Sequence, residues 1–196
     1  ERLGADIIMA FDECSSPYDP TQNELAVEHT HSWAERCVRA KTRDDQALFG
    51  IIQGRINPEL RKRSVDYLST LELPGYAIGG LSVGETKSET LSILELVDVY
   101  LPENKPRYLM GVGSPEDLVN GVSRGVDIFD CVLPTRLARH HVAITRTGRI
   151  NIANAKYSSD ALPIDETCSC YACMNFSRAY LRHLVLAKEI LGATLL

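Results

Sequence analysis

The chain has 196 residues, of which 44% are hydrophobic, and it carries a formal net charge of −5 at pH 7. This content is enough for one domain with a substantial core plus a small appendage, and the acidity excludes a surface coated with positive charge for non-specific nucleic-acid binding. No apolar run reaches transmembrane length and residues 1–20 lack a signal-peptide pattern, so we expect a cytoplasmic protein with no membrane partner.

Five short apolar segments, each bounded by glycine, proline or an acidic residue, predict buried parallel strands. These segments are 6–11, 47–53, 76–81, 107–112 and 126–133. Helical patterns lie between them at 24–40, 58–70, 86–100 and 115–124. The alternation predicts an α/β fold, either a doubly wound sheet or a (β/α)8 TIM barrel. Because no Gly-x-Gly-x-x-Gly fingerprint follows the first strand, we expect the barrel.

The pattern changes after these strands. Segments 142–145 and 149–153 flank a turn with Gly148 and predict a hairpin, and a helix is expected at about 177–191, ending at Gly192. We therefore expect about five βα units at 1–139, and a hairpin with a small zinc-binding subdomain and a C-terminal helix at 140–196. The chain starts in the middle of a pattern and without Met, so we expect a fragment.

Asp130 ends the last apolar segment and precedes a basic stretch. No Asp or Glu occurs from Cys131 to Ser159, which contains Arg136, Arg139, Arg146, Arg149 and Lys156 beside His140 and His141. Such a stretch can place phosphates, although a solvated basic face is an equal alternative. A carboxylate at a strand end can attack an electrophilic sugar carbon, so Asp130 is a candidate nucleophile, with a loop-capping role as its alternative.

Polar or backbone-exposing residues also follow the other predicted strands. Asp12 offers acceptors for the N1–H and amine of a guanine-like edge, while the Gln53 amide and the Gly80 N–H offer donors for its O6. Tyr108 and Met110 predict the wall of a slot for a flat ring. Taken singly, Asp12, Gln53 and Gly80 are better explained as turn or cap residues, and only their shared placement at strand ends makes the base pocket an equal alternative. Ordinary barrel packing explains Tyr108 and Met110 equally well.

Cys168, Cys170 and Cys173 form a Cys-x-Cys-x-x-Cys cluster, which predicts one structural Zn²⁺. Three thiolates leave the fourth tetrahedral position open. His183 on the following helix can reach such a site, and it is equally explained as a surface histidine.

Several motifs together resemble the tRNA-guanine transglycosylases of the queuine tRNA-ribosyltransferase family, in the bacterial form. They are segments 11–14, 50–54, 79–85, 108–113 and 129–136 with the cysteine cluster. The resemblance implies a pentosyltransferase that exchanges guanine at the wobble position of a tRNA with a GUN anticodon for the 7-deazaguanine base 7-aminomethyl-7-deazaguanine, in queuosine biosynthesis. It implies double displacement through a covalent bond between Asp130 and the ribose, and a homodimer.

The resemblance also assigns residues. It places the base at Asp12, Gln53 and Gly80, with the Leu81 carbonyl and Glu85 at the aminomethyl end and Tyr108 and Met110 along the slot. Cys14 and Val83 match the bacterial pattern of the base pocket. Two tRNA-contacting segments are implied, Gly111, Val112, Gly113, Ser114, Pro115, Glu116 and Asp117 in the first, and Thr135, Arg136, Leu137, Ala138 and Arg139 in the second.

Two elements of the family pattern are not found in the chain. The general acid/base Asp is expected upstream of the first strand and the zinc-binding His beyond Leu196, so we expect these residues alone to be inactive.

Three alternatives are weighed. A non-catalytic tRNA-binding subunit of the same superfamily would lack Asp130, and an archaeosine-type transglycosylase is disfavoured by Cys14 and Val83. A zinc-dependent base deaminase needs His-x-Glu and Pro-Cys-x-x-Cys, and the sequence has neither.

Overall fold

The computed structural model describes residues 3–16 and 19–196, and these described residues form two compact units, one that ends at Cys131 and one that begins at Val132. The segment 132–139, which we expected to continue the barrel part, packs within the second unit.

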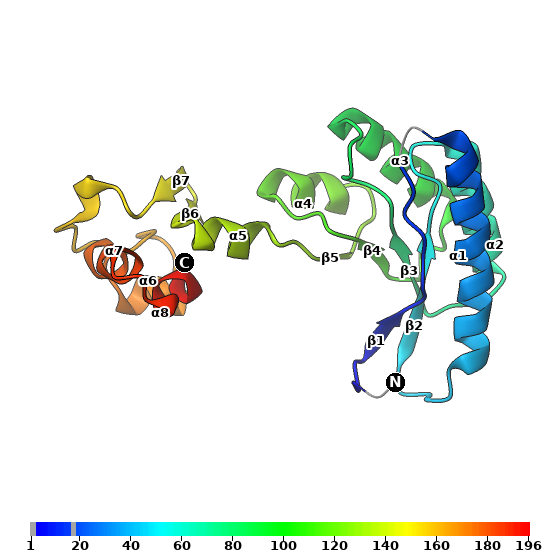
Figure 1. Cartoon of the computed structure of the whole chain (residues 1–196), viewed down its shortest axis with the longest axis horizontal. Coiled ribbons are helices and arrows are strands. Elements are labelled where there is room, and N and C mark those ends of the chain that lie inside the picture. The colour runs from blue at the N-terminus through cyan, green and yellow to red at the C-terminus, as the bar shows by residue number, and fades with distance from the viewer. Residues whose placement is uncertain (1–2, 17–18) are drawn as a thin grey trace. The chain divides into compact units, whose positions relative to one another are not determined.

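The first unit contains a parallel sheet (Figure 1). Its strands are β1 (Ile7–Met9), β2 (Ala47–Ile52), β3 (Gly75–Ile78), β4 (Arg107–Leu109) and β5 (Ile128–Phe129). All neighbouring pairs are parallel, and the order β1-β2-β3-β4-β5 follows the chain without reversing. A doubly wound sheet reverses its order at a switch point, whereas a barrel does not. The unit is therefore an α/β fold consistent with part of a (β/α)8 barrel.

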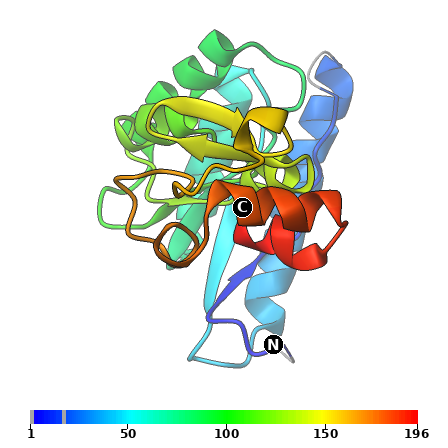
Figure 2. The same ribbon diagram turned by 90° about the vertical axis from the view of Figure 1, so that its left-hand side faces the viewer.

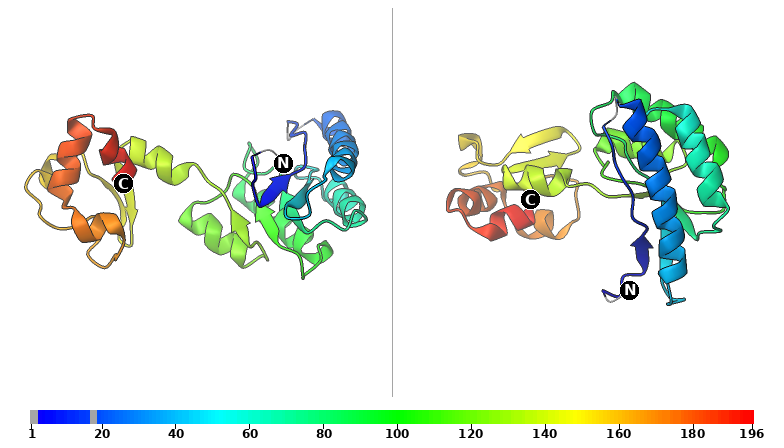
Figure 3. Two further views of the ribbon diagram at one scale, coloured as in Figure 1. Left: turned by 90° about the horizontal axis from the view of Figure 1, so that it is seen from below. Right: turned by 45° about the vertical axis from the view of Figure 1, so that its right-hand side comes forward.

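Helices connect the strands and are visible in both views of Figure 3. They are α1 (Pro20–Ala40), α2 (Pro58–Ser69), α3 (Lys87–Tyr100) and α4 (Pro115–Val122). Each begins after a side chain that accepts a hydrogen bond from a first-turn N–H, namely Asp19, Asn57, Thr86 and Ser114. Within the described part of the chain, no helix has the length and apolarity needed to cross a membrane.

The core lies between the sheet and its helices. Ile52 of β2, Leu68 of α2 and Val97 of α3 are completely buried in one cluster. The expected strands are confirmed in place, but all five end earlier than expected. The last one, expected at 126–133, contains only Ile128–Phe129, because the chain after Asp130 turns into a helix.

The second unit contains the expected hairpin and a group of short helices (Figure 2, yellow to red). Its elements are α5 (Leu133–Arg139), β6 (Val142–Thr145), β7 (Gly148–Asn151), a 3-10 helix (Ala155–Tyr157), α6 (Tyr171–Asn175), α7 (Arg178–Leu186) and α8 (Ile190–Leu195). Strands β6 and β7 pair antiparallel, which confirms the hairpin. Helices α5 and α6 were not predicted.

The single helix expected at 177–191 was wrong. The chain forms α7 and then α8, and Lys188 between them has a φ of +61°, which breaks the helical path. Gly192, expected as the stop, lies buried inside α8. A Cβ there would lie 3.0 Å from Val185 Cγ1, so the glycine allows α8 to pack closely on α7.

Candidate functional site

The carboxyl ends of the five parallel strands lie at one edge of the sheet, and the candidate site residues follow them there. Asp12 and Cys14 follow β1, Gln53 follows β2, Gly80 follows β3, and Asp130 follows β5. The fold of the first unit therefore brings together residues from segments far apart in the chain.

Asp12 and Gln53 contact each other directly. Nε2 of Gln53 donates to Asp12 Oδ2 at 2.6 Å, and the Gln53 side chain is 1% exposed. A buried amide held in this way keeps one orientation, because its alternative leaves polar atoms unpaired. The pair presents a carboxylate and an amide as one rigid unit.

Gly80 lies against this unit. Its φ is +66°, in the left-handed region, and a Cβ on it would clash with Oε1 of Gln53. The neighbouring Gly79 is similarly close, since its Cβ would lie 2.8 Å from Gln53 Nε2. Only glycine allows the backbone after β3 to approach the amide, which leaves backbone groups available at this edge.

Glu85 holds the loop that follows Gly80. Its carboxylate accepts hydrogen bonds from the N–H of Ser82, from the N–H of Val83 at 3.2 Å and from the Thr90 hydroxyl at 2.9 Å. Partial burial opposes ionisation, but these hydrogen bonds together hold the pKa of Glu85 below its ordinary value. In this loop the side chain of Leu81 is buried, whereas that of Val83 is half exposed.

Asp130 is exposed and is held through one oxygen. Its Oδ1 accepts from the Tyr108 hydroxyl at 2.6 Å and from the Gly111 N–H at 2.7 Å. Burial and the hydrogen bond to Asp130 raise the pKa of Tyr108 to about 12, so the phenol remains a donor at neutral pH. Tyr108 thus supports the carboxylate, a role that the sequence analysis did not assign to it. Met110, on the same connection, is half-buried.

The segment 111–117 contains the loop after β4 and the first residues of α4, and several side-chain contacts order it. Ser114 accepts from the Asp117 N–H at 3.2 Å, and Lys87 of α3 binds Glu116 at 2.9 Å and Asp117 at 3.2 Å. Gly113 packs so closely on Cys131 that a Cβ there would lie 2.5 Å from the Cys131 Cβ. Lys87 was missed by the sequence analysis, although it neutralises the two acidic residues of a segment expected to contact RNA.

The second expected RNA segment, 135–139, lies in α5 of the second unit. Ala138 is buried, whereas Arg136 and Arg139 are exposed. Thr135 donates to the Val132 carbonyl at 3.1 Å in the first turn. The buried alanine anchors the helix in its unit and leaves both guanidinium groups in solvent.

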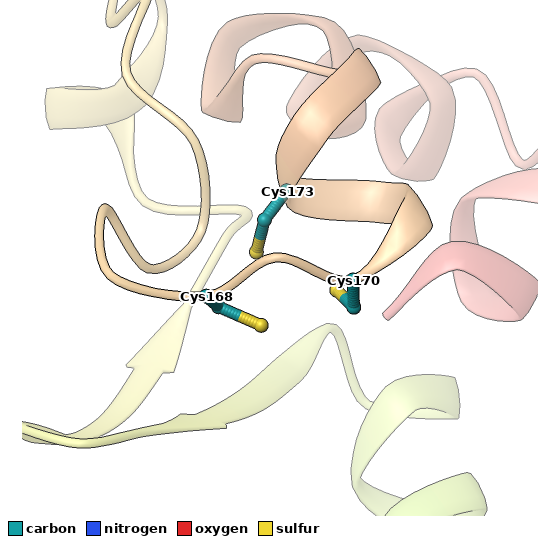
Figure 4. Close-up of side chains that lie close together, drawn as sticks. All are labelled: Cys168, Cys170 and Cys173. Carbon is teal, nitrogen blue, oxygen red and sulfur yellow. The ribbon is translucent and has the colours of Figure 1, made fainter.

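The three clustered cysteines converge in the second unit, where Cys168 and Cys170 precede α6 and Cys173 lies on it (Figure 4). Their sulfur atoms lie within 4.8 Å of one another. A tetrahedral zinc with Zn–S bonds of about 2.3 Å needs sulfur atoms about 3.8 Å apart, so small side-chain movements suffice. Among the described residues, the group contains these three ligands alone, and the exposed His183 is not one of them.

The pKa values of Cys170 and Cys173 shift in opposite directions. The backbone N–H of Cys173 and the thiol of Cys168 lower the pKa of Cys170, whereas burial raises the pKa of Cys173 to about 11. A metal must therefore displace a proton from Cys173. The soft donor set fits zinc, with one position left for another ligand.

The comparisons with known proteins agree with the motifs. A family model described as Queuine tRNA-ribosyltransferase matches residues 1–196. The chain belongs to this family. Among curated relatives, the Queuine tRNA-ribosyltransferase of Moorella thermoacetica is 58% identical over 100% of the chain, that of Halothermothrix orenii 58% over 98%, and that of a Nostoc species 54% over 99%. The chain spans about half the length of these relatives, 52% in each case.

Two further buried residues near the strand ends of this family member were not predicted from sequence. Arg55 and Arg61 are 2% and 0% exposed, and both extend under the strand ends. Burial and the neighbouring Arg55 lower the pKa of Arg61 to about 9, which still leaves it charged at pH 7. Sequence reasoning expects arginines in solvent, and no local pattern distinguishes these two from the exposed Arg63.

Proposed function

We propose that the complete protein containing these residues is a tRNA-guanine transglycosylase that exchanges guanine at the wobble position for 7-aminomethyl-7-deazaguanine. The observation that carries the proposal is the placement of Asp130. One of its oxygens is held by Tyr108 and Gly111, at the sheet edge where Asp12, Gln53 and Gly80 also lie. Membership of the family supports the same reaction.

Asp130 acts as the nucleophile of a double displacement. Oδ2 attacks C1′ of the ribose, the bond from C1′ to N9 of guanine breaks, and guanine leaves with the electron pair and takes up a proton. The ribose is then bonded to Asp130. The incoming base attacks C1′ through its own ring nitrogen, loses the proton there, and releases the carboxylate. The two hydrogen bonds to Oδ1 orient the carboxylate for this attack.

The flipped-out base binds at the neighbouring strand ends. Asp12 accepts from the N1–H and amine of the guanine-like edge, and Gln53 and Gly80 donate to its O6. The Leu81 carbonyl, with Glu85 behind its loop, binds the aminomethyl group, while Cys14 and Val83 border the pocket. Met110 and Tyr108 line the slot beside the ring.

The anticodon loop is held by the segments 111–117 and 135–139. Their contribution is positional, since phosphate and sugar contacts do not carry sequence information, and specificity comes from the base pocket and the neighbouring bases. Exposed Arg136 and Arg139 support this assignment for the second segment. The first segment contributes backbone groups, because its carboxylates are bound by Lys87.

The three clustered cysteines bind a structural Zn²⁺ in this proposal. The metal, held by Cys168, Cys170, Cys173 and a fourth ligand, would crosslink the loop before α6 to that helix. The resemblance supports a barrel of eight βα units, a cytoplasmic homodimer, and tRNA with a GUN anticodon as the partner.

Two alternatives are less well supported. A non-catalytic tRNA-binding subunit needs no nucleophile, yet Asp130 is present and held by two donors. An archaeosine-type transglycosylase is disfavoured because the relatives from Moorella thermoacetica and Halothermothrix orenii, both 58% identical to the chain, are named Queuine tRNA-ribosyltransferase.

The test is covalent trapping. The complete protein is incubated with 9-deazaguanine and an unmodified tRNA that carries its wobble guanine in a U-G-U context. We expect a protein–RNA band that survives denaturation and that Asp130→Asn loses while still binding tRNA. A band that persists in Asp130→Asn would refute the nucleophile. Measurable tRNA binding by the wild type without any band would favour the non-catalytic subunit.

A further inference from the structure

Arg55 adopts a conformation that is unfavourable for its residue type. Its φ is +53°, a region in which a residue with a Cβ is uncommon, and its side chain is 2% exposed. Its Nε is buried with no hydrogen-bond partner in the described residues. A strained backbone and an unpaired buried donor both cost stability, so stability alone does not explain an arginine here.

The contacts of Arg55 point instead to the base pocket. Nη1 donates to the Gly80 carbonyl at 2.9 Å and to the Cys14 sulfur at 3.2 Å. Cys14 follows β1, Arg55 follows β2 and Gly80 follows β3. One guanidinium nitrogen therefore joins the three loops that follow these strands. Its aliphatic stem also packs against Gly80, where a Cβ would lie 3.2 Å from Arg55 Cδ.

Two side chains of opposite charge, Arg55 and Glu85, hold the backbone of the loop after β3. Arg55 binds the carbonyl of Gly80, while the Glu85 carboxylate binds the N–H groups of Ser82 and Val83. Because each trans peptide is planar, holding one of its polar groups also orients the other. The orientations of the peptides on both sides of Leu81 are thus set by charged side chains.

Arg61 holds Arg55 in place. Its Nε donates to the Arg55 carbonyl at 2.7 Å, and its Nη1 donates to the Ile52 carbonyl at 2.8 Å. Arg61 is fully buried on α2, which anchors residue 55 to the helix behind the sheet. The strained conformation of Arg55 is thereby maintained by contacts outside the pocket.

We infer that Arg55 is a positioning residue for the base pocket, which fixes the Gly80–Leu81 peptide and the Cys14 side chain relative to one another. The inference rests on the proposed function, and it adds a residue that contacts the pocket from beneath. Arg55 sets how tightly the incoming base binds, whereas the chemistry at Asp130 proceeds without it.

The experiment compares Arg55→Gly, Arg55→Lys and Arg63→Ala in the complete protein. Glycine adopts the backbone conformation of residue 55 without strain, so Arg55→Gly removes the side chain without adding backbone strain. Arg55→Lys keeps the charge, with a donor that can still reach the Gly80 carbonyl. Arg63→Ala removes the same charge from an exposed position of α2, where Arg63 pairs with Glu24.

The KM for guanine and for 7-aminomethyl-7-deazaguanine is measured from exchange of labelled guanine in tRNA, together with kcat, the KM for tRNA and the Tm. Loss of a charged hydrogen bond predicts a KM for both bases raised about tenfold in Arg55→Gly, with kcat and tRNA KM little changed, while the Tm reports the stability lost with the buried side chain. Arg55→Lys restores part of the base affinity, and Arg63→Ala matches the wild type.

The outcomes separate the two claims. An active wild type together with an Arg55→Gly variant of unchanged base KM overturns the role of Arg55 and leaves the proposed function intact. The same holds if base KM and tRNA KM rise equally, or if Arg63→Ala behaves like Arg55→Gly. A wild type that neither exchanges guanine nor binds either base overturns the proposed function and this inference with it.

Discussion

Tyr108 of β4 lies beside Ile128 of β5 in the parallel register, and its hydroxyl reaches Asp130, two residues further along. Asp130 directly follows β5, so the register of this strand pair brings its carboxylate to the Tyr108 hydroxyl. The hydroxyl holds one of the two equivalent carboxylate oxygens and leaves the other without this contact.

Tyr108→Phe tests this relationship. The substitution keeps the ring and removes the donor, so we expect the rate of covalent adduct formation to fall about tenfold, equivalent to roughly 1.4 kcal/mol, with tRNA affinity unchanged. Single-turnover trapping with 9-deazaguanine measures the rate. Tyr100→Phe, on the exposed face of α3, is the matched control. An adduct rate in Tyr108→Phe equal to that of the wild type would show that Gly111 alone suffices.

Gly80→Ala should damage both stability and base binding. At a φ of +66° the Cβ adds backbone strain and also collides with Gln53 Oε1, so we expect a loss of about 3 kcal/mol in the free energy of unfolding. Gly4→Ala is the control, because Gly4 has a φ of +71° with nothing within 4 Å of its Cβ, and strain alone costs about 1 kcal/mol. Chemical denaturation measures the free energy of unfolding of both variants. Equal losses in Gly80→Ala and Gly4→Ala would contradict the predicted collision.

His31 should make stability depend on pH. It stacks on Tyr67 with ring centroids 4.2 Å apart, and burial, followed by the charge of Arg63, lowers its pKa from 6.5 to about 4. As pH falls, His31 therefore takes up its proton at a higher pH in the unfolded chain than in the folded one. The contribution of neutral His31 is complete above pH 6.5 and is lost as pH falls toward 4, by about 3 kcal/mol at most.

Denaturant titrations from pH 7 to pH 4 check this prediction. We expect His31→Gln to flatten the pH dependence of the unfolding free energy between pH 6.5 and pH 4. A slope that survives in His31→Gln would assign the pH dependence to other groups.

Loss of one clustered thiol should remove the metal and loosen the second unit. We expect Cys170→Ser to lower the zinc content of the purified protein and to reduce its Tm, because metal binding contributes to folding free energy. A chelator should reproduce the Tm loss in the wild type and have little effect on the variant. Cys37→Ser, in the first unit, keeps full zinc occupancy. Zinc retained in Cys170→Ser would exclude this cluster as the site.

Much of the fold was predictable because its signals are local. Buried parallel strands appear as short apolar runs. Asn57 and Ser114 are residue types that cap the first turn of a helix, so they indicate where α2 and α4 begin. The break after Leu186 was not predictable in this way, since the apolar pattern continues past it, while the turn at Lys188 and the close packing of Gly192 on Val185 belong to the tertiary structure.

The sequence by itself determined the βα alternation, the family, the cysteine cluster and the identity of the residues at the strand ends, because each is encoded within a few neighbouring positions. Only the tertiary structure decided that Gln53 is paired with Asp12, that Tyr108 supports Asp130, and that Arg55 is buried beneath Gly80. These contacts join residues far apart in the chain. Their geometry depends on strand register and on packing of the whole sheet, and no local pattern contains either.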